Sequence, residues 1–258
     1  MYPASTEVFF YNIQPYDSYW RLAQKFRTTV EAISSVNPGI PPGHLYVGQR
    51  IAIPHSPHRA SNKSPHCISE AEVALKSTTR LLWEQHITWT RMAIISLTFK
   101  LPDVDFVIAR LLQNATDMGN SIKPCYGEEI GNKYGALIKD HLLIAADLVK
   151  VAMKGDQQAV AATQKKWYAN AEDIARFLSS INPYLTEEGV RKMFFTHLDL
   201  TAKEAVSMIN KDYKTDVAVF DEIEKEALEM ADAISSAIVK QFPDLFKEGA
   251  SSQYWQLY

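Results

Sequence analysis

The 258-residue chain has little cysteine, no strong excess of either charge and no long apolar run. Its two cysteines, Cys67 and Cys125, match neither a disulfide framework nor a zinc-binding spacing, so we expect free thiols. A net charge of −3 without a basic run gives no electrostatic basis for binding nucleic acid or an anionic membrane surface. No segment reaches the roughly 18 apolar residues of a membrane span, and phosphate-loop, dinucleotide and nucleophile-elbow fingerprints are missing. The sequence therefore gives no indication of nucleic-acid binding, membrane association or nucleotide-dependent or nucleophile-elbow catalysis.

The first part of the chain alternates strand and helix patterns. Residues 8–13 form a β-branched and aromatic run typical of a strand, and residues 50–53 form another. Between the two runs, an Asp-Ser pair can cap one helix, and Thr28 can open a capping box for a second helix. An Asn-Pro-Gly turn then ends the second helix. The pattern predicts a small β-α-α-β module.

Residues 7–54 contain an ordered series of short motifs: Tyr11-Asn12-Ile13, Asp17-Ser18-Tyr19-Trp20, Asn37-Pro38-Gly39-Ile40 and Leu45-Tyr46-Val47-Gly48-Gln49, followed by Ile51-Ala52-Ile53-Pro54. On these motifs, the segment resembles a LysM domain. LysM domains as a family bind polymers that contain N-acetylglucosamine, such as peptidoglycan and chitin, between the loop entering the first helix and the loop leaving the second. The resemblance implies that the glycan contacts here are Asp17, Ser18, Tyr19, Asn37, Pro38, Gly39, Ile40 and Leu45.

Several of these residues also have a purely structural interpretation. Asp17 can be a helix cap, Pro38 a stop signal, and Ile40 and Leu45 can be core residues. Each interpretation is compatible with contact to a glycan, because loop residues that shape a groove also touch its ligand.

The remainder of the chain is predicted to be all-helical. Residues 55–68 are polar and interrupted by proline, as in a linker, and they separate the module from a domain over 69–248. Apolar residues then recur at spacings of three and four, which predicts helices over 69–99, 103–121, 127–154, 156–181, 186–210 and 213–241. Six helices with short connections indicate a bundle whose neighbours run antiparallel. The fold class is therefore α+β for the module, followed by an all-α bundle.

The expected helices contain a repeat with a period of about 56 residues. His86, His141 and His197 occupy similar helical positions, one period apart. The helices that follow carry a second pattern: Asn114-Ala115-Thr116-Asp117, Asn170-Ala171-Glu172-Asp173 and Glu229-Met230-Ala231-Asp232. The first two copies are one period apart and the third lies slightly further on, which requires a small insertion. We therefore expect three repeated helical hairpins, each with a histidine on one helix and an Asn/Glu-x-x-Asp face on the next.

Two interpretations of the repeated histidines follow. The favoured one is structural: each buried histidine is hydrogen-bonded to the Asp or Asn across from it, which satisfies polar atoms and sets the helix register. The alternative is a site for Zn, Fe or Mn built from His86, His141 and His197 with Asp117, Asp173, Asp232 or Glu229. The favoured interpretation needs no cofactor.

The sequence as a whole favours a non-enzymatic bacterial envelope or spore protein. In this interpretation the module binds peptidoglycan or a chitin-type glycan, and the helical domain is a scaffold that contacts a protein partner or a second copy of the chain. The alternative is a metal-binding bundle, either an enzyme or a storage protein, that the module directs to the cell wall. Because residues 1–7 lack the basic and apolar regions of a secretory signal, we expect a cytoplasmic origin and action at the wall or spore surface.

Overall fold

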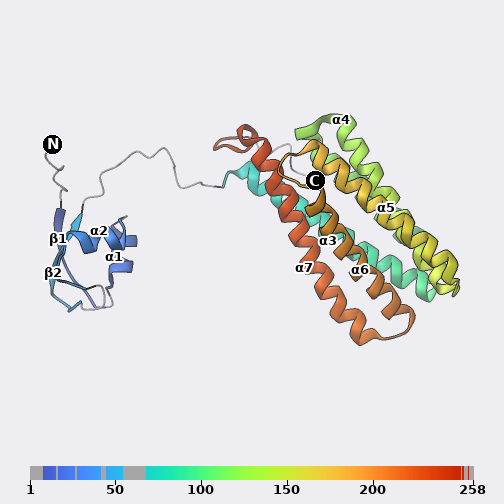
Figure 1. Cartoon of the computed structure of the whole chain (residues 1–258), viewed down its shortest axis with the longest axis horizontal. Coiled ribbons are helices and arrows are strands. Elements are labelled where there is room, and N and C mark those ends of the chain that lie inside the picture. Colours follow the sequence, from blue (N-terminus) through green and yellow to red (C-terminus); the bar gives the residue numbers. More distant parts are fainter. Residues whose placement is uncertain are drawn as a thin grey trace. The chain divides into compact units, whose positions relative to one another are not determined.

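A computed structural model describes residues 8–15, 17–26, 28–41, 45–54, 68–250, 252 and 255. The chain divides into two compact units, residues 1–66 and 67–258 (Figure 1). The expected linker, apart from Ile68, lies outside the described residues, and so does Cys67. Cys125 is a free, half-buried thiol whose pKa is raised to about 12 by burial.

The first unit has the expected β-α-α-β order. It consists of β1 (Val8–Asn12), α1 (Tyr19–Lys25), α2 (Val30–Ser35) and β2 (Arg50–Pro54). The two strands pair antiparallel, with Val8 opposite Pro54 and Asn12 opposite Arg50. Their buried side chains and those of the helices form one small core, which contains Ile13, Tyr19, Leu22, Ala23, Ile33, Ile51 and Ile53. The predicted fold class of the module is confirmed.

The cap of α2 differs from the expected one. Thr29, and not Thr28, is the N-cap: its Oγ1 accepts a hydrogen bond from the backbone N–H of Ala32 at 3.1 Å. Two adjacent threonines offer equivalent hydroxyls, and Thr29 has the extended backbone that an N-cap requires. The expected start of this helix was therefore wrong by one residue.

All the regular elements described in the second unit are helices, as predicted. It contains α3 (Glu70–Phe99), α4 (Val104–Met153), α5 (Gln157–Ile181), α6 (Glu187–Ile209) and α7 (Tyr213–Gln241), followed by the 3-10 helix η1 (Pro243–Phe246). The expected helices 103–121 and 127–154 are joined in α4, but Gly127 has φ 83° and ψ 173°, which interrupts the helix. The described part of this unit therefore has six long helical segments, as the apolar periodicity predicts, and the short helix η1 follows them.

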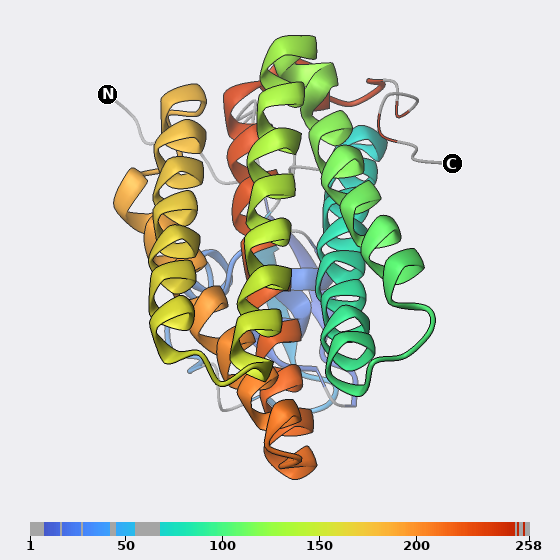
Figure 2. The ribbon, with the colours of Figure 1, turned by 90° about the vertical axis from the view of Figure 1, so that its right-hand side faces the viewer.

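The two halves of α4 pack against each other through glycines. A Cβ atom on Gly119 would lie 2.6 Å from the carbonyl oxygen of Gly131, and one on Gly135 would lie 3.1 Å from the carbonyl oxygen of Ala115. The facing residues are closer in sequence the nearer they lie to Gly127, so the two halves run antiparallel and form a hairpin (Figure 2). The repeated glycines thus allow close approach of two helix backbones.

Gly119→Ala is expected to destabilise the helical unit by about 1–3 kcal/mol, because the added methyl group overlaps the backbone of the facing half of α4. Chemical denaturation followed by circular dichroism measures the loss. Thr116→Ala, at an exposed position of the same helix, is the matched control and should change stability little. Equal stability of the two variants would show that the helices separate without penalty.

The helical segments are arranged as three hairpins around a main core, and a smaller buried cluster contains Ile94, Val149, Ala205 and Met208. Contacts join α3 with the first half of α4, the second half of α4 with α5, and α6 with α7, and α3 also contacts α7. The turns at 100–103, 154–156 and 210–212 lie at the same end of the bundle (Figure 2). The largest fully buried side chains of the main core include Trp83, Trp167 and Phe194.

Candidate functional site

The loop entering α1 is held by short-range hydrogen bonds. The backbone N–H of Gln14 donates to Oδ2 of Asp17 at 2.8 Å, and the N–H of Asp17 donates back to the carbonyl of Gln14 at 3.1 Å. Ser18 Oγ accepts from the N–H of Arg21 at 3.2 Å, as an N-cap does. Asp17 therefore closes the turn before the helix, and Ser18 is its cap. Both side chains are half-buried at the module surface.

The loop leaving α2 is attached to β2 by the side chain of Asn37. This buried side chain donates from Nδ2 to the carbonyls of Ile33 and Ala52, both at 2.7 Å, and its Oδ1 accepts from the N–H of Ala52 at 2.8 Å. Both amide protons are used, so Asn37 behaves as an extra strand partner for β2. Its contribution to a groove is to hold the loop in place.

A further hydrogen bond connects the two loop regions. The phenol of Tyr19 is buried at the start of α1 and donates to the carbonyl of Ile40 at 3.1 Å. Burial also raises the pKa of Tyr19 above its ordinary value. Pro38 and Gly39, between Asn37 and Ile40, are exposed, and Gly39 has φ +97°, which favours glycine.

The eight predicted contact residues therefore have different environments. Pro38 and Gly39 are exposed, whereas Tyr19 and Asn37 are buried and hydrogen-bonded. The others are half-buried, and among them Ile40 and Leu45 pack against the module core. The structure thus places a fixed pair of loops at the predicted position, with an exposed tip and apolar flanks.

Two exposed aromatic residues next to these loops were not predicted as site residues. Trp20 is 65% exposed and follows Tyr19, while Tyr46 is 67% exposed and follows Leu45. Aromatic faces on a surface are suited to stacking against sugar rings. A sequence signal existed, because both positions are large aromatics that immediately follow predicted contact residues.

A second candidate site lies in the bundle, where three histidines from three helices meet. His86 of α3, His141 of α4 and His197 of α6, here called the histidine cluster, are all buried. Their ring centroids are 5.7, 6.3 and 6.3 Å apart. One nitrogen from each ring lies within 4.8 Å of the others, a separation compatible with a shared metal ion.

Each histidine of the cluster has a hydrogen-bond partner on the second helix of its hairpin. The partners of Nδ1 are Asn114 Oδ1 for His86 at 3.3 Å, Asn170 Oδ1 for His141 at 3.0 Å, and Glu226 Oε2 for His197 at 3.0 Å. The amide groups are themselves oriented, since their Nδ2 atoms donate to the carbonyls of Leu82 and Leu137. The helix partners therefore determine how the rings face one another.

Glu226 occupies the position for which sequence reasoning proposed Glu229 or Asp232. The interval from Asn170 to Glu226 equals the interval from Asn114 to Asn170, so the partners of the histidines repeat without an insertion. Glu229 and Asp232 are exposed, and Asp232 pairs with Arg80 at 2.6 Å. The missed signal was the uninterrupted period: the third copy was placed at Glu229 because Asp232 follows it by three residues, whereas Glu226 has no Asp at that spacing.

The other two predicted carboxylates also have partners elsewhere. Asp117 is half-buried and accepts from Nε2 of Gln113 at 2.9 Å, and the exposed Asp173 pairs with Arg176. Among the described residues, the metal-compatible group contains the three histidines without any of the four predicted carboxylates.

The surroundings of the histidine cluster keep two of its rings uncharged. Burial lowers the pKa of His86 well below its ordinary value, and the neighbouring histidines lower it further. Burial likewise lowers the pKa of His141 to about 3. At neutral pH these two imidazoles are therefore neutral, the form that binds metal ions.

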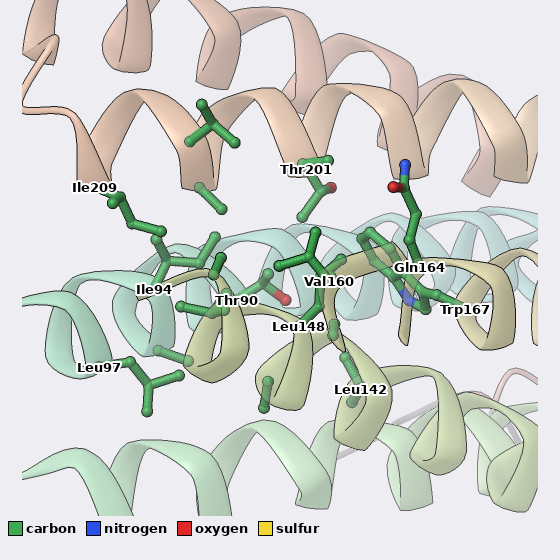
Figure 3. A pocket seen from close by; sticks show the side chains of 18 of the residues that line it. Thr90, Ile94, Leu97, Leu142, Leu148, Val160, Gln164, Trp167, Thr201 and Ile209 are labelled. Atoms are coloured by element: carbon green, nitrogen blue, oxygen red, sulfur yellow. The ribbon is translucent and has the colours of Figure 1, made fainter. Parts of the chain in front are cut away.

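An apolar chamber of about 180 Å³ lies one helical turn beyond the cluster. Thr90, Ala145 and Thr201, each four residues after a histidine of the cluster, are among its lining residues. Figure 3 shows Thr90, Thr201 and Trp167 lining this chamber from α3, α6 and α5. On the opposite side, the residues three positions before the histidines are Trp83, Ile138 and Phe194, and all three are buried. The cluster therefore has one closed side and one side toward a cavity.

The helical unit also contains a buried ion-pair network centred on Arg91. Arg91 donates to Glu204 at 2.6 Å and to Asp216 at 2.5 Å, and its guanidinium lies 4.7 Å from the ring centre of Phe220. Burial raises the pKa of Glu204 to about 7, although Arg91 opposes this shift. The network joins α3, α6 and α7.

Comparisons with known proteins give a family match for the first unit and none for the second. Residues 11–54 match the LysM domain family, so the module is a LysM domain, and no family matches the rest of the chain. No curated protein and no solved structure matches the chain. The LysM match supports binding of glycans that contain N-acetylglucosamine. Among the described residues, no helix is sufficiently long and apolar to span a membrane.

Proposed function

We propose that this chain is a non-enzymatic binding protein whose LysM domain attaches it to peptidoglycan or a chitin-type glycan at a bacterial cell wall or spore surface. The observation that carries the proposal is the LysM match over residues 11–54, which includes both loops fixed by the Tyr19–Ile40 and Asn37–Ala52 hydrogen bonds. Loops that are already fixed lose little conformational entropy on binding.

The chemistry of these loops suits an acetamido sugar. The methyl of an N-acetyl group needs an apolar contact, which the half-buried side chains of Ile40 and Leu45 offer. Its amide needs hydrogen-bond partners, and the exposed backbone around Gly39 has groups of both kinds. Trp20 and Tyr46 add aromatic faces for the sugar rings.

The helical unit serves in this proposal as an interaction or scaffold domain. Several large apolar side chains are exposed near the turns at 100–103 and 210–212, which lie at the same end of the bundle: Phe99, Leu101, Phe106, Val206, Tyr213 and Val217. Exposed apolar groups of this kind are typical of protein contacts. Self-association through such a surface would raise the avidity of a chain with a single LysM domain.

Sedimentation with insoluble polymers tests the glycan proposal. The full chain is expected to pellet with peptidoglycan, chitin or both, and to remain in the supernatant with cellulose, which lacks the acetamido group. If the chain stayed in the supernatant with both acetamido polymers, the proposal would fail.

A pair of lysine variants locates the contact. Pro38→Lys places a long charged side chain on the exposed loop tip and should reduce the pelleted fraction several-fold. Glu31→Lys introduces the same side chain at the exposed, opposite end of α2 and should pellet like the wild type. Equal reduction by both variants would place the contact elsewhere on the module.

A further inference from the structure

We propose that His86, His141 and His197 form a binding site for one divalent transition-metal ion of the zinc type, with an open coordination position toward the apolar chamber. This inference goes beyond the glycan-binding function and concerns the helical unit alone. It rests on the convergence of the three rings, on their hydrogen-bond partners and on the chamber beside them.

The hydrogen bonds determine which nitrogen faces the site. The amide oxygens of Asn114 and Asn170 can only accept, so His86 and His141 carry their proton on Nδ1. The carboxylate of Glu226 imposes the same arrangement on His197. Nε2 of each ring is then free to act as a lone-pair donor. Because one nitrogen of each ring lies within 4.8 Å of the others, one metal ion can be shared by the three rings.

The spacing of the cluster is close to that of a three-histidine zinc site. Zinc–nitrogen bonds of about 2.1 Å in a tetrahedral site place the nitrogens roughly 3.4 Å apart. The ligand nitrogens here lie within 4.8 Å of one another, so each ring needs to move inward by less than about 1 Å.

The hydrogen-bond partners match the outer shell of such a site. Histidines that bind metal commonly donate their other N–H to a carboxylate or an amide carbonyl, which fixes the tautomer and raises the basicity of the ligand. Glu226 supplies the one negative charge among the three partners, so a divalent ion would leave a net positive site. Such a site favours an anionic fourth ligand, such as hydroxide or a small carboxylate.

The chamber gives a fourth ligand a route to the open coordination position of the metal ion. Because the buried Trp83, Ile138 and Phe194 close one side of the cluster, a fourth ligand enters from the side of the cavity. Two polar groups among the chamber residues, Oγ1 of Thr90 and Nε1 of Trp167, are buried without a hydrogen-bond partner within the described structure. They are suited to donate to a ligand held there, while the apolar walls favour a small ligand with a hydrocarbon part.

The test uses the full chain, stripped of metal by a chelator and titrated with zinc chloride in a calorimeter. The expected result is one zinc per chain. Cobalt(II) in place of zinc should give the intense visible absorption of a tetrahedral site. Absence of zinc binding, or the weak spectrum of an octahedral cobalt ion, would overturn the proposal.

Two variants assign the ligands. His197→Gln keeps a side chain of similar size that can still hydrogen-bond to Glu226, and it should lower zinc affinity at least 100-fold while the helical circular dichroism is retained. Asp232→Asn removes an exposed carboxylate and should bind zinc like the wild type. Undiminished binding by His197→Gln, or loss of binding in Asp232→Asn, would contradict the assignment. Pelleting with chitin or peptidoglycan should be the same for both variants, so this test and the glycan test fail independently.

Discussion

Arg91→Met is expected to lower the free energy of unfolding of the helical unit by about 3–5 kcal/mol at neutral pH. Methionine preserves much of the aliphatic volume but leaves Glu204 and Asp216 buried without their cation. Both carboxylate side chains are 2% exposed, so water cannot replace the guanidinium. Urea denaturation of the full chain, followed at a helical wavelength, measures the change.

The loss of unfolding free energy caused by Arg91→Met should become smaller as the pH falls toward 5. Burial already raises the pKa of Glu204 to about 7 in the native protein, and removal of Arg91 raises it further. A carboxyl group whose pKa is higher in the folded than in the unfolded state adds stability at low pH, which is lost as the pH rises through the folded value. Arg80→Met, which breaks the exposed pair with Asp232, should cost at most about 1 kcal/mol at either pH. Similar losses in the two variants would contradict a buried network.

Asn37→Ala is expected to unfold the LysM domain and abolish glycan binding. The change removes three hydrogen bonds and leaves the N–H of Ala52 without a partner inside the module. An unsatisfied buried group costs about 1–3 kcal/mol, and a module of under fifty residues has little stability to lose. Loss of the dispersed amide signals of residues 8–54 in an NMR spectrum of the full chain measures this unfolding.

Asn37→Asp is a second test of this prediction. Its carboxylate still accepts from the N–H of Ala52, but its second oxygen faces the carbonyls of Ile33 and Ala52 and cannot donate to them, so this variant should be no more stable than Asn37→Ala. The signals of the helical unit should be unchanged in both variants. A folded, glycan-binding Asn37→Ala protein would show that the loop is held by other contacts.

The helices were predictable because their signals are local. Apolar spacing places the ends of α3, α6 and α7 within about one residue of their bounds, and Ser69, Thr186 and Asp212 supply the N-caps. The end of the first half of α4 could not be predicted in the same way. This half continues past residue 121 and through Pro124, and it ends where the positive φ of Gly127 interrupts the helix.

The sites were less predictable because they depend on contacts between distant residues. Asn37 resembles a turn residue in sequence, whereas its main partner, Ala52, is 15 residues away. The three histidines were identified by their spacing, but whether they meet depends on how three hairpins pack. Glu226 was missed because the expected Asp three residues further on is absent there, which moved the third copy of the pattern to Glu229 and Asp232.

The most direct test of the account is an NMR titration of the full chain with a soluble N-acetylglucosamine oligomer. The backbone amides of Ser18, Gly39 and Ile40 are expected to show saturable shifts, with little change at the amide of Glu31 or in the helical unit. A lack of shifts at ligand concentrations that saturate other LysM domains would contradict the account. So would shifts confined to the helical unit.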